Sequence, residues 1–238
     1  MHFYLGSCRY MHIFSNFCPI RLHSTHDILF ILQNLSYLSS LRDTLPRPMF
    51  YNGRKNFLKR GWSDVCCHFI ANKVPMLLSH SNEITDVYVE LSSRKQYYFN
   101  TKIPIVHFYV SERAKRRFNL QEHTLTDAEM AQHITSLQET IRTIFNPSCS
   151  LHIITHLDLK SSKLNSLIPS RHSFVNYLVS FCKEHNIHCI TPHVIFTGLF
   201  IEDVLSDGRH FYPNSLKIIA KHFEHQLETV PYTHLEIL

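Results

Sequence analysis

The stretch His2-Phe-Tyr-Leu-Gly-Ser-Cys8 begins with an apolar run and passes at once to a glycine and two small polar residues. The apolar run predicts an opening β-strand, and the residues after it predict a helix over about 8–16. Gly6 lets the chain turn tightly between the two elements. A first strand that leads directly into a helix is typical of α/β folds.

The same alternation continues along the chain. Four further strands are expected, over 19–22, 86–91, 151–155 and 187–190, of which 86–91 is the clearest. Three further helices are expected, from residue 24, over about 173–185 and over about 214–227. The pattern predicts an α/β fold, a three-layer α/β/α sandwich with a five-stranded parallel sheet in flavodoxin-like order.

Two segments, about 42–82 and 95–145, elaborate this frame as insertions. The first contains scattered prolines and glycines, which predict a long irregular connection. We find no internal repeat and no low-complexity tract in the sequence. We therefore expect a single α/β domain that spans residues 1–238.

The second insertion carries two weaker patterns. Residues 97–99 and 105–109 are rich in aromatic and β-branched side chains, which predicts a β-hairpin between them. Residues 111–145 predict one or two helices, the second of which begins near Thr126 and Asp127.

Composition excludes several classes of protein. The net charge is only +5, and the one dense basic run, 113–117, is typical of a solvated helix face, so no nucleic acid partner is expected. No apolar run reaches the roughly 18 residues of a membrane span. The first residues lack a signal-peptide pattern, and the seven cysteines show no disulfide framework, so we expect a cytoplasmic protein.

The sequence predicts neither a metal nor a cofactor. Its nineteen histidines make a metal site worth testing. The tightest group of candidate ligands comprises Cys182, His185, His188 and Cys189, and it lacks the paired spacing of a structural zinc site. Neither phosphate-binding glycine pattern, GxGxxG or GxxxxGK[ST], occurs in the chain.

Nucleophiles and bases gather where the predicted strands end. Ligands of open parallel sheets bind at the carboxyl ends of the strands. Cys8 follows the first predicted strand there and would begin a helix, whose backbone N–H groups stabilise a thiolate. Ser7 is a competing nucleophile, one position earlier. A small buried cysteine at a tight turn would produce the same local sequence.

The string Asp207-Gly208-Arg209-His210 comes just before the last predicted helix. Its spacing allows the carboxylate to fold back onto the imidazole and fix the tautomer, which leaves the other nitrogen to act as a base. The alternative is a solvated Asp-Gly turn with a capping histidine.

Together, Gly6-Ser7-Cys8 and Asp207-Gly208-Arg209-His210 resemble the motifs of the SGNH, or GDSL-type, hydrolase superfamily. That family has Gly-Asp-Ser after its first strand and Asp-x-x-His before its last helix. The resemblance implies an SGNH-like fold and a triad in which Cys8 takes the place of the family's serine, His210 is the base and Asp207 orients it. Ser92-Ser93-Arg94 replaces the family's Gly-x-Asn-Asp.

The remaining site residues follow from this placement. The backbone N–H of Cys8, with Ser92 or Ser93, is expected to stabilise the oxyanion. The candidates for substrate contacts come from the other strand ends and are Ser7, His23, His26, Arg94 and His156.

The functional prediction is an acyl-ester hydrolase or acyltransferase that uses a Cys-His-Asp triad. Its expected partner is a small-molecule or carbohydrate ester, with acyl-CoA as a candidate donor. One alternative is a non-catalytic module of the same fold that binds an acyl carrier or a glycan. The other is a domain that serves in protein interaction.

Overall fold

The computed structural model describes residues 1–11, 13–15, 20–23, 32–33, 74–99, 103–104, 115–116, 119–207 and 210–229. Five parallel strands form the main sheet in the order β2-β1-β3-β7-β8. The strands are β1 (His2–Gly6), β2 (Ile20–His23), β3 (Asp86–Leu91), β7 (Ser150–Thr155) and β8 (His188–Ile190). This is the flavodoxin-like order, so the predicted α/β fold class is confirmed.

Six α-helices and three 3₁₀ turns lie within the described ranges, and residues 32–33 and 115–116 are also helical. The α-helices are α1 (Cys8–Met11), α6 (Val74–Ser79), α8 (Asp127–Ile144), α9 (Pro169–Glu184), α10 (Ile201–Val204) and α11 (Pro213–Thr229). The 3₁₀ turns are η1 (Ile13–Ser15), η2 (Ser81–Glu83) and η3 (Pro192–Phe196). The longest of these elements are α8, α9 and α11.

Alternate residues of strands such as β1 and β3 enter two separate cores, because successive side chains of a strand point to opposite faces. On β1, Phe3 and Leu5 join one hydrophobic cluster, while Tyr4 joins the other. On β3, Val87 and Val89 lie on the first side and Tyr88 on the second. Burial on both faces explains why the strands are apolar runs without a clear polar face.

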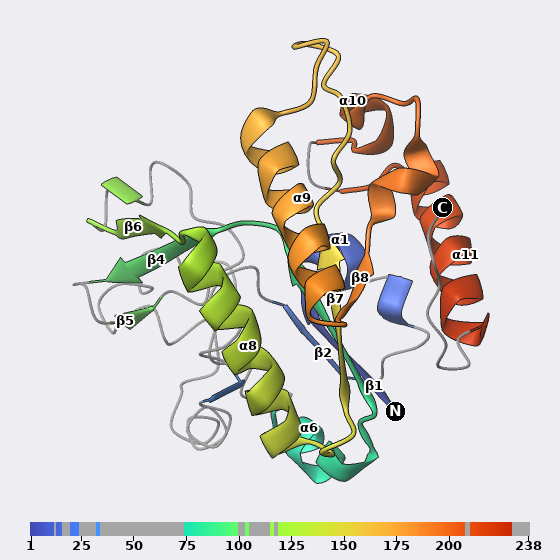
Figure 1. Cartoon of the computed structure of the whole chain (residues 1–238). Helices are drawn as coiled ribbons and strands as arrows, with labels where there is room; N and C mark the ends of the chain where they lie inside the picture. The colour runs from blue at the N-terminus through green and yellow to red at the C-terminus, as the bar shows by residue number, and fades with distance from the viewer. Residues whose placement is uncertain are drawn as a thin grey trace, which may run out of the picture.

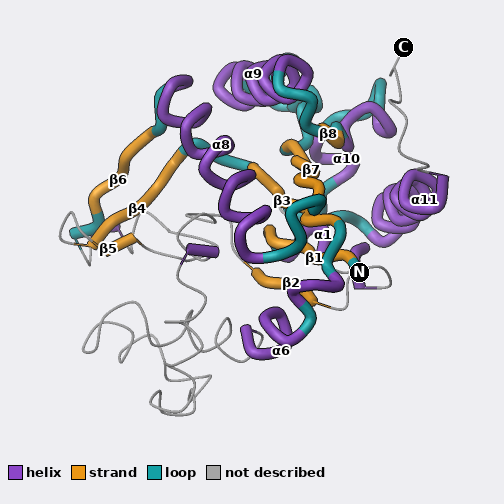
Figure 2. The backbone as a smooth tube through the Cα atoms, turned by 60° about the horizontal axis from the view of Figure 1, so that its bottom comes forward, coloured by secondary structure: helices purple, strands orange, loops and turns teal. Residues whose placement is uncertain are grey.

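Helices cover both faces of the sheet (Figure 1). The first cluster contains buried side chains of α8 and α9, among them Ile134 and Leu178. The second contains Ile219 and Phe223 of α11 together with Phe14 of η1. Figure 2 shows α8 and α9 on one side of the row of strands and α11 on the other, which is the three-layer arrangement.

A second, three-stranded sheet follows β3. It has the order β5-β4-β6, with β4 (Lys95–Phe99), β5 (Ile103–Pro104) and β6 (Gln121–Thr124) all antiparallel to their neighbours. The predicted hairpin therefore exists, but Phe99 pairs with Ile103 and not with the 105–109 segment, which lies outside the described residues. The helical prediction for 111–145 was wrong at β6, which is wholly exposed and has no apolar pattern.

Two helices differ from their predicted bounds, one near the N-terminus and one in the second half of the chain. The helix expected over 8–16 is a single turn, α1, followed by η1. Helix α9 begins four residues earlier than expected, with Pro169 in its first turn, where proline is favoured. The start of α8 was predicted correctly, because Thr126 and Glu129 form a capping box.

Candidate functional site

A buried polar cluster lies beneath the turn from β1 to α1. Glu90 on β3 is fully buried, and its Oε2 accepts a hydrogen bond from the backbone N–H of Ser7 at 2.8 Å. The Tyr4 hydroxyl lies 3.0 Å from both that oxygen and the carbonyl oxygen of Ser7. Arg9 Nη1 lies 3.4 Å from Glu90 Oε1, and its side chain is 8% exposed. Three donors therefore surround one carboxyl group.

Gly6 makes this cluster possible. A Cβ placed on Gly6 would lie 2.7 Å from the Cβ of Glu90 and closer still to the Tyr4 hydroxyl. Real Cβ atoms do not approach other atoms that closely, so any side chain at position 6 would displace Glu90 or Tyr4. The glycine of the opening string is required by the close approach of β3.

Ser7 acts as the cap of α1. Its Oγ accepts a hydrogen bond from the backbone N–H of Arg9 at 3.2 Å, and the residue is buried. Cys8 is the first residue of α1, and its side chain lies outside the described part of the chain. A helix of one turn has a much weaker dipole than a long one, so α1 itself contributes little to thiolate stability.

The pair Asp207 and His210 is formed as predicted. Asp207 Oδ2 lies 2.7 Å from Nδ1 of His210, and Asp207 Oδ1 accepts the backbone N–H of His210 at 2.8 Å. Both side chains are about half exposed, at 52% and 53%. The carboxylate therefore fixes Nδ1 as the donor, which makes Nε2 the nitrogen that can take up a proton.

Aromatic packing connects the segment that follows Cys8 with the segment that follows His210. The ring of Tyr10, two residues after Cys8, lies 5.6 Å from the ring of Phe211, the neighbour of His210, in a T-shaped contact. Both rings belong to the second hydrophobic cluster. The segments at the two ends of the chain therefore pack against each other within this cluster.

A second polar group lies at the carboxyl end of β7. His156 Nδ1 donates to the carbonyl oxygen of Leu157 at 3.1 Å, and Arg171 Nη1 donates to the same oxygen at 3.4 Å. Burial, with the nearby charges of Arg9 and Arg171, holds the pKa of His156 well below its usual range. His156 is therefore a neutral imidazole at physiological pH.

A further Asp–His pair lies beside this group. Asp158 Oδ2 is 2.6 Å from Nδ1 of His172, and the Asp158 side chain is buried while His172 is 44% exposed. The other oxygen, Asp158 Oδ1, is buried without a hydrogen-bond partner, as is Nδ1 of His193. Buried polar atoms of this kind are often bridged by ordered water.

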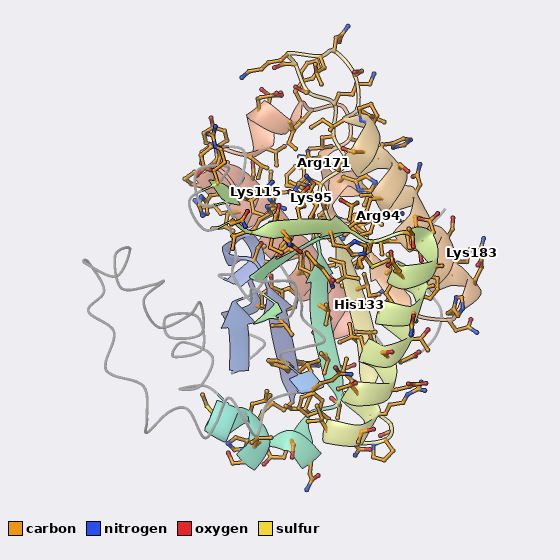
Figure 3. All side chains as sticks on the ribbon, turned by 90° about the vertical axis from the view of Figure 1, so that its left-hand side faces the viewer. Arg94, Lys95, Lys115, His133, Arg171 and Lys183 are labelled. Atoms are coloured by element: carbon orange, nitrogen blue, oxygen red, sulfur yellow. The ribbon has the colours of Figure 1, made fainter. Side chains whose placement is uncertain are left out.

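The other predicted site residues have partners within the protein, or lie wholly or partly outside the described residues. Arg94 forms an ion pair with Asp127 and packs over the rings of Phe174 and Tyr177, with its guanidinium carbon 5.0 and 4.6 Å from their centroids. Figure 3 shows Arg94 beside the start of α8. Its guanidinium therefore joins α8 to α9.

The two serines that follow β3 are partly buried, and Ser93 Oγ accepts the backbone N–H of Lys95 at 3.0 Å within the turn. His23 ends β2 in register with Gly6, which places its backbone at the edge, while its side chain is outside the described part. His26 lies outside the described residues.

Part of the basic run 113–117 is described. Lys115 lies next to Lys95, since both form ion pairs with Glu122, and Figure 3 shows the two side chains together on the small sheet. Lys115 also lies over the ring of Tyr97, while Arg116 is exposed. The charge of Lys115 is therefore engaged within the protein.

Sequence reasoning missed Glu90, Arg9, Tyr4 and Arg171. The available signal was a charged residue, Glu90, inside a strand whose other residues after Asp86 are apolar or aromatic. A buried carboxylate needs partners, and a mid-strand Glu indicates a built polar site. The partner, Arg9, is 81 residues away in sequence, so no local pattern identifies it.

Within the described ranges, no group of three or more His, Cys, Asp or Glu side chains is arranged to hold a metal ion. The Cys182, His185, His188 and Cys189 group is included in that search. Over the same part of the chain, none of the helices has both the length and the apolar character that crossing a bilayer requires.

Comparison with known proteins gives fold-level likeness at most. No protein-family model and no curated protein matches the sequence. Two mutants of Axe2, an acetyl-xylooligosaccharide esterase from Geobacillus, are 10% and 11% identical, with TM-scores of 0.44 and 0.43. A catalytic mutant of Axe2, an acetylxylan esterase from Geobacillus stearothermophilus, is 12% identical with a TM-score of 0.42. Each comparison covers 99% of this chain and 96% of the other.

Proposed function

We propose that this protein is an acyl-ester hydrolase or acyltransferase in which Cys8 is the nucleophile, His210 the general base and Asp207 its orienting carboxylate. The observation that carries the proposal is the T-shaped contact of Tyr10 with Phe211, 5.6 Å between ring centroids. It ties the turn that bears Cys8 to the loop that bears the paired Asp207 and His210.

The reaction follows from the groups at this edge. His210 Nε2 accepts the proton of the Cys8 thiol, and the thiolate attacks the carbonyl carbon of the ester. The tetrahedral intermediate expels the alkoxide, which takes the proton from His210, and a thioester remains on Cys8. Water, or an acceptor alcohol in acyl transfer, then attacks the thioester as it gives its proton to His210. The second tetrahedral intermediate breaks the bond between carbon and sulfur, which releases the acid or the new ester, and the Cys8 thiolate takes the proton back from His210.

The oxyanion donors are restricted by the buried cluster. The N–H of Ser7 is already bonded to Glu90, and the N–H of Arg9 is bonded to Ser7 Oγ. Among the backbone groups of this turn, the N–H of Cys8 is therefore the one assigned to the oxyanion. Ser92 or Ser93 is its proposed side-chain partner.

Neutral His156 and the Arg171 guanidinium suit the binding of polar substituents, because one offers an acceptor nitrogen and the other offers donors. We assign a small-molecule or carbohydrate ester as the substrate class, with acyl-CoA as the candidate donor for transfer. The proposed substrate contacts of Ser7, His23, His26 and Arg94 rest on their sequence positions.

The test is hydrolysis of p-nitrophenyl acetate and of acetylated oligosaccharides, with intact-mass detection of an acyl group on Cys8. Cys8→Ala is expected to remove both turnover and the acyl adduct. Cys149→Ala is the matched control, because burial raises the pKa of that thiol to about 12. Full turnover by Cys8→Ala would overturn the nucleophile assignment. Thermal stabilisation by acyl-CoA or glycan without product, unchanged in His210→Ala, would favour a binding module.

A further inference from the structure

Glu90 is the most completely buried carboxyl group at the proposed site. It is 0% exposed, near the carboxyl end of the central strand β3. A carboxylate so placed is costly unless donors surround it, and here the donors are the N–H of Ser7, the hydroxyl of Tyr4 and the guanidinium of Arg9. Burial and the Glu90 charge raise the pKa of Tyr4 well above its usual range, so that phenol stays a donor.

The contacts of Glu90 lie on both sides of Cys8. One oxygen binds the backbone of residue 7, and the other pairs with the side chain of residue 9. The segment between them contains Cys8 alone. Ser7 Oγ closes the turn by accepting the N–H of Arg9. The position of Cys8 relative to β3 is therefore set by one carboxylate through two tethers.

We propose that Glu90 is a positioning residue for Cys8, which fixes the turn that carries the nucleophile and offsets the positive charge of Arg9 beside it. This inference rests on the proposed function for the role of Cys8, and it adds a residue from a different strand. Glu90 itself is inaccessible to a substrate, so it acts through the turn.

The charges that act on the turn come from several elements. Glu90 belongs to β3, Arg9 to α1 and Arg171 to α9, while His156 after β7 is neutral. The phenols of Tyr4 and Tyr10 stay protonated, because burial raises the pKa of each. Removing the carboxylate would leave Arg9 unbalanced and favour the Cys8 thiolate, whereas removing Arg9 would do the opposite.

The experiment measures the rate at which iodoacetamide alkylates Cys8 as a function of pH, by peptide mass spectrometry on the full chain. Glu90→Gln is expected to shift the midpoint downward by about one pH unit, and Arg9→Gln to shift it upward by a similar amount. Asp86→Asn is the matched control, because Asp86 is also buried but begins the same strand at the opposite edge. Its midpoint should equal that of the wild type.

Opposite shifts identify the role, since an unfolded chain would give all variants one ordinary thiol midpoint. Unchanged midpoints in folded Glu90→Gln and Arg9→Gln would overturn the proposal. If Glu90→Gln does not unfold cooperatively, the proposal is tested with Arg9→Gln and the charge-preserving Arg9→Lys. The midpoint of Cys8 alkylation must rise in Arg9→Gln and remain at the wild-type value in Arg9→Lys.

The outcome is separable from that of the proposed function. If the wild-type protein turns over no ester but the alkylation midpoints of Glu90→Gln and Arg9→Gln still shift in opposite directions, Glu90 is retained as a positioning residue and the enzymatic function is rejected. Normal turnover that depends on Cys8, with no shift in either variant, would retain the enzyme and reject the role of Glu90.

Discussion

The rings of Tyr10 and Phe211 meet at a centroid separation of 5.6 Å and an interplanar angle of 62°. One ring follows the first strand and the other precedes the last helix, so nearly the whole chain lies between them. Their contact is part of a cluster that also contains Phe223 of α11. Packing of this kind fixes the relative position of the two segments without a covalent link.

The Asp207–His210 pair predicts a specific loss of activity. Because both side chains are about half exposed, their replacement should leave stability almost unchanged. His210→Ala is expected to lower ester turnover by about 10²–10⁴-fold, the usual contribution of a general base. Asp207→Asn should lower it as well, since the tautomer is then no longer fixed.

The matched control for His210 is His80, which pairs with Glu83 at the same three-residue spacing, 3.0 Å apart, on another part of the surface. His80→Ala should retain wild-type turnover. Equal losses in His80→Ala and His210→Ala would show that the effect is not specific to the proposed site.

Ser7→Ala distinguishes the two nucleophiles of the opening string. Because Ser7 Oγ caps α1, its loss should cost about 1 kcal/mol of stability. Once the melting curve confirms folding, the variant should still form the acyl adduct on Cys8 and retain measurable turnover, because only the cap and one proposed substrate contact are lost. A loss of turnover as complete as that of Cys8→Ala would transfer the nucleophile role to Ser7.

Gly6→Ala should damage both stability and activity. The new methyl group would meet Glu90 and Tyr4, at a cost of about 1–3 kcal/mol. Gly198→Ala is the comparison, because Gly198 has a φ of 89° with open space around it and its replacement costs about 1–2 kcal/mol through the backbone alone. Chemical denaturation should show two destabilised proteins, of which Gly6→Ala alone turns over ester more slowly when folded.

Acid should destabilise the opposite edge of the sheet. His152 Nδ1 lies 2.8 Å from Nδ1 of His188, and its Nε2 lies 2.8 Å from Asp86. Burial, with the charge of His152, lowers the pKa of His188 from 6.5 to about 4. The unfolded chain therefore takes up this proton first, and stability falls as the pH drops from about 6.5 towards 4.

Urea unfolding at about pH 7 and about pH 5 measures this effect. His188→Gln should lose less stability between the two pH values than the wild type, because it lacks the titrating ring. His80→Gln, at a histidine whose side chain is 41% exposed, should lose as much as the wild type. If His188→Gln loses as much stability as the wild type between the two pH values, the His152–His188 pair is not the cause of the acid destabilisation.

The main sheet could be predicted because its determinants are local. Strands such as 86–91 are short, mostly apolar runs bounded by polar residues, and their alternation with helical patterns indicates parallel pairing. Strand β6 could not be predicted, because Gln121–Thr124 has no apolar residue and forms only through its register with β4. The Asp207–His210 pair was predictable for the same reason as the strands, since three residues of turn determine it.

The buried half of the site could not be predicted from local patterns. Tyr4 and Glu90 are 86 residues apart, and their contact depends on the pairing of β1 with β3. His156 has an ordinary sequence environment, and its pKa is lowered by burial together with the nearby charges of Arg9 and Arg171. Such features depend on tertiary contacts, whereas sequence periodicity indicates only whether a segment forms a helix or a strand.

Gly6, Tyr4 and Glu90 occupy one continuous volume, which has an evolutionary consequence. A larger residue at position 6 is tolerable only when the side chains at 4 and 90 shrink in the same lineage. The three positions should therefore change together among related sequences, and a lineage that lost Glu90 would be released from the need for glycine. The residue types found at position 6 would then indicate which lineages retain the buried carboxylate of Glu90 beneath the turn from β1 to α1.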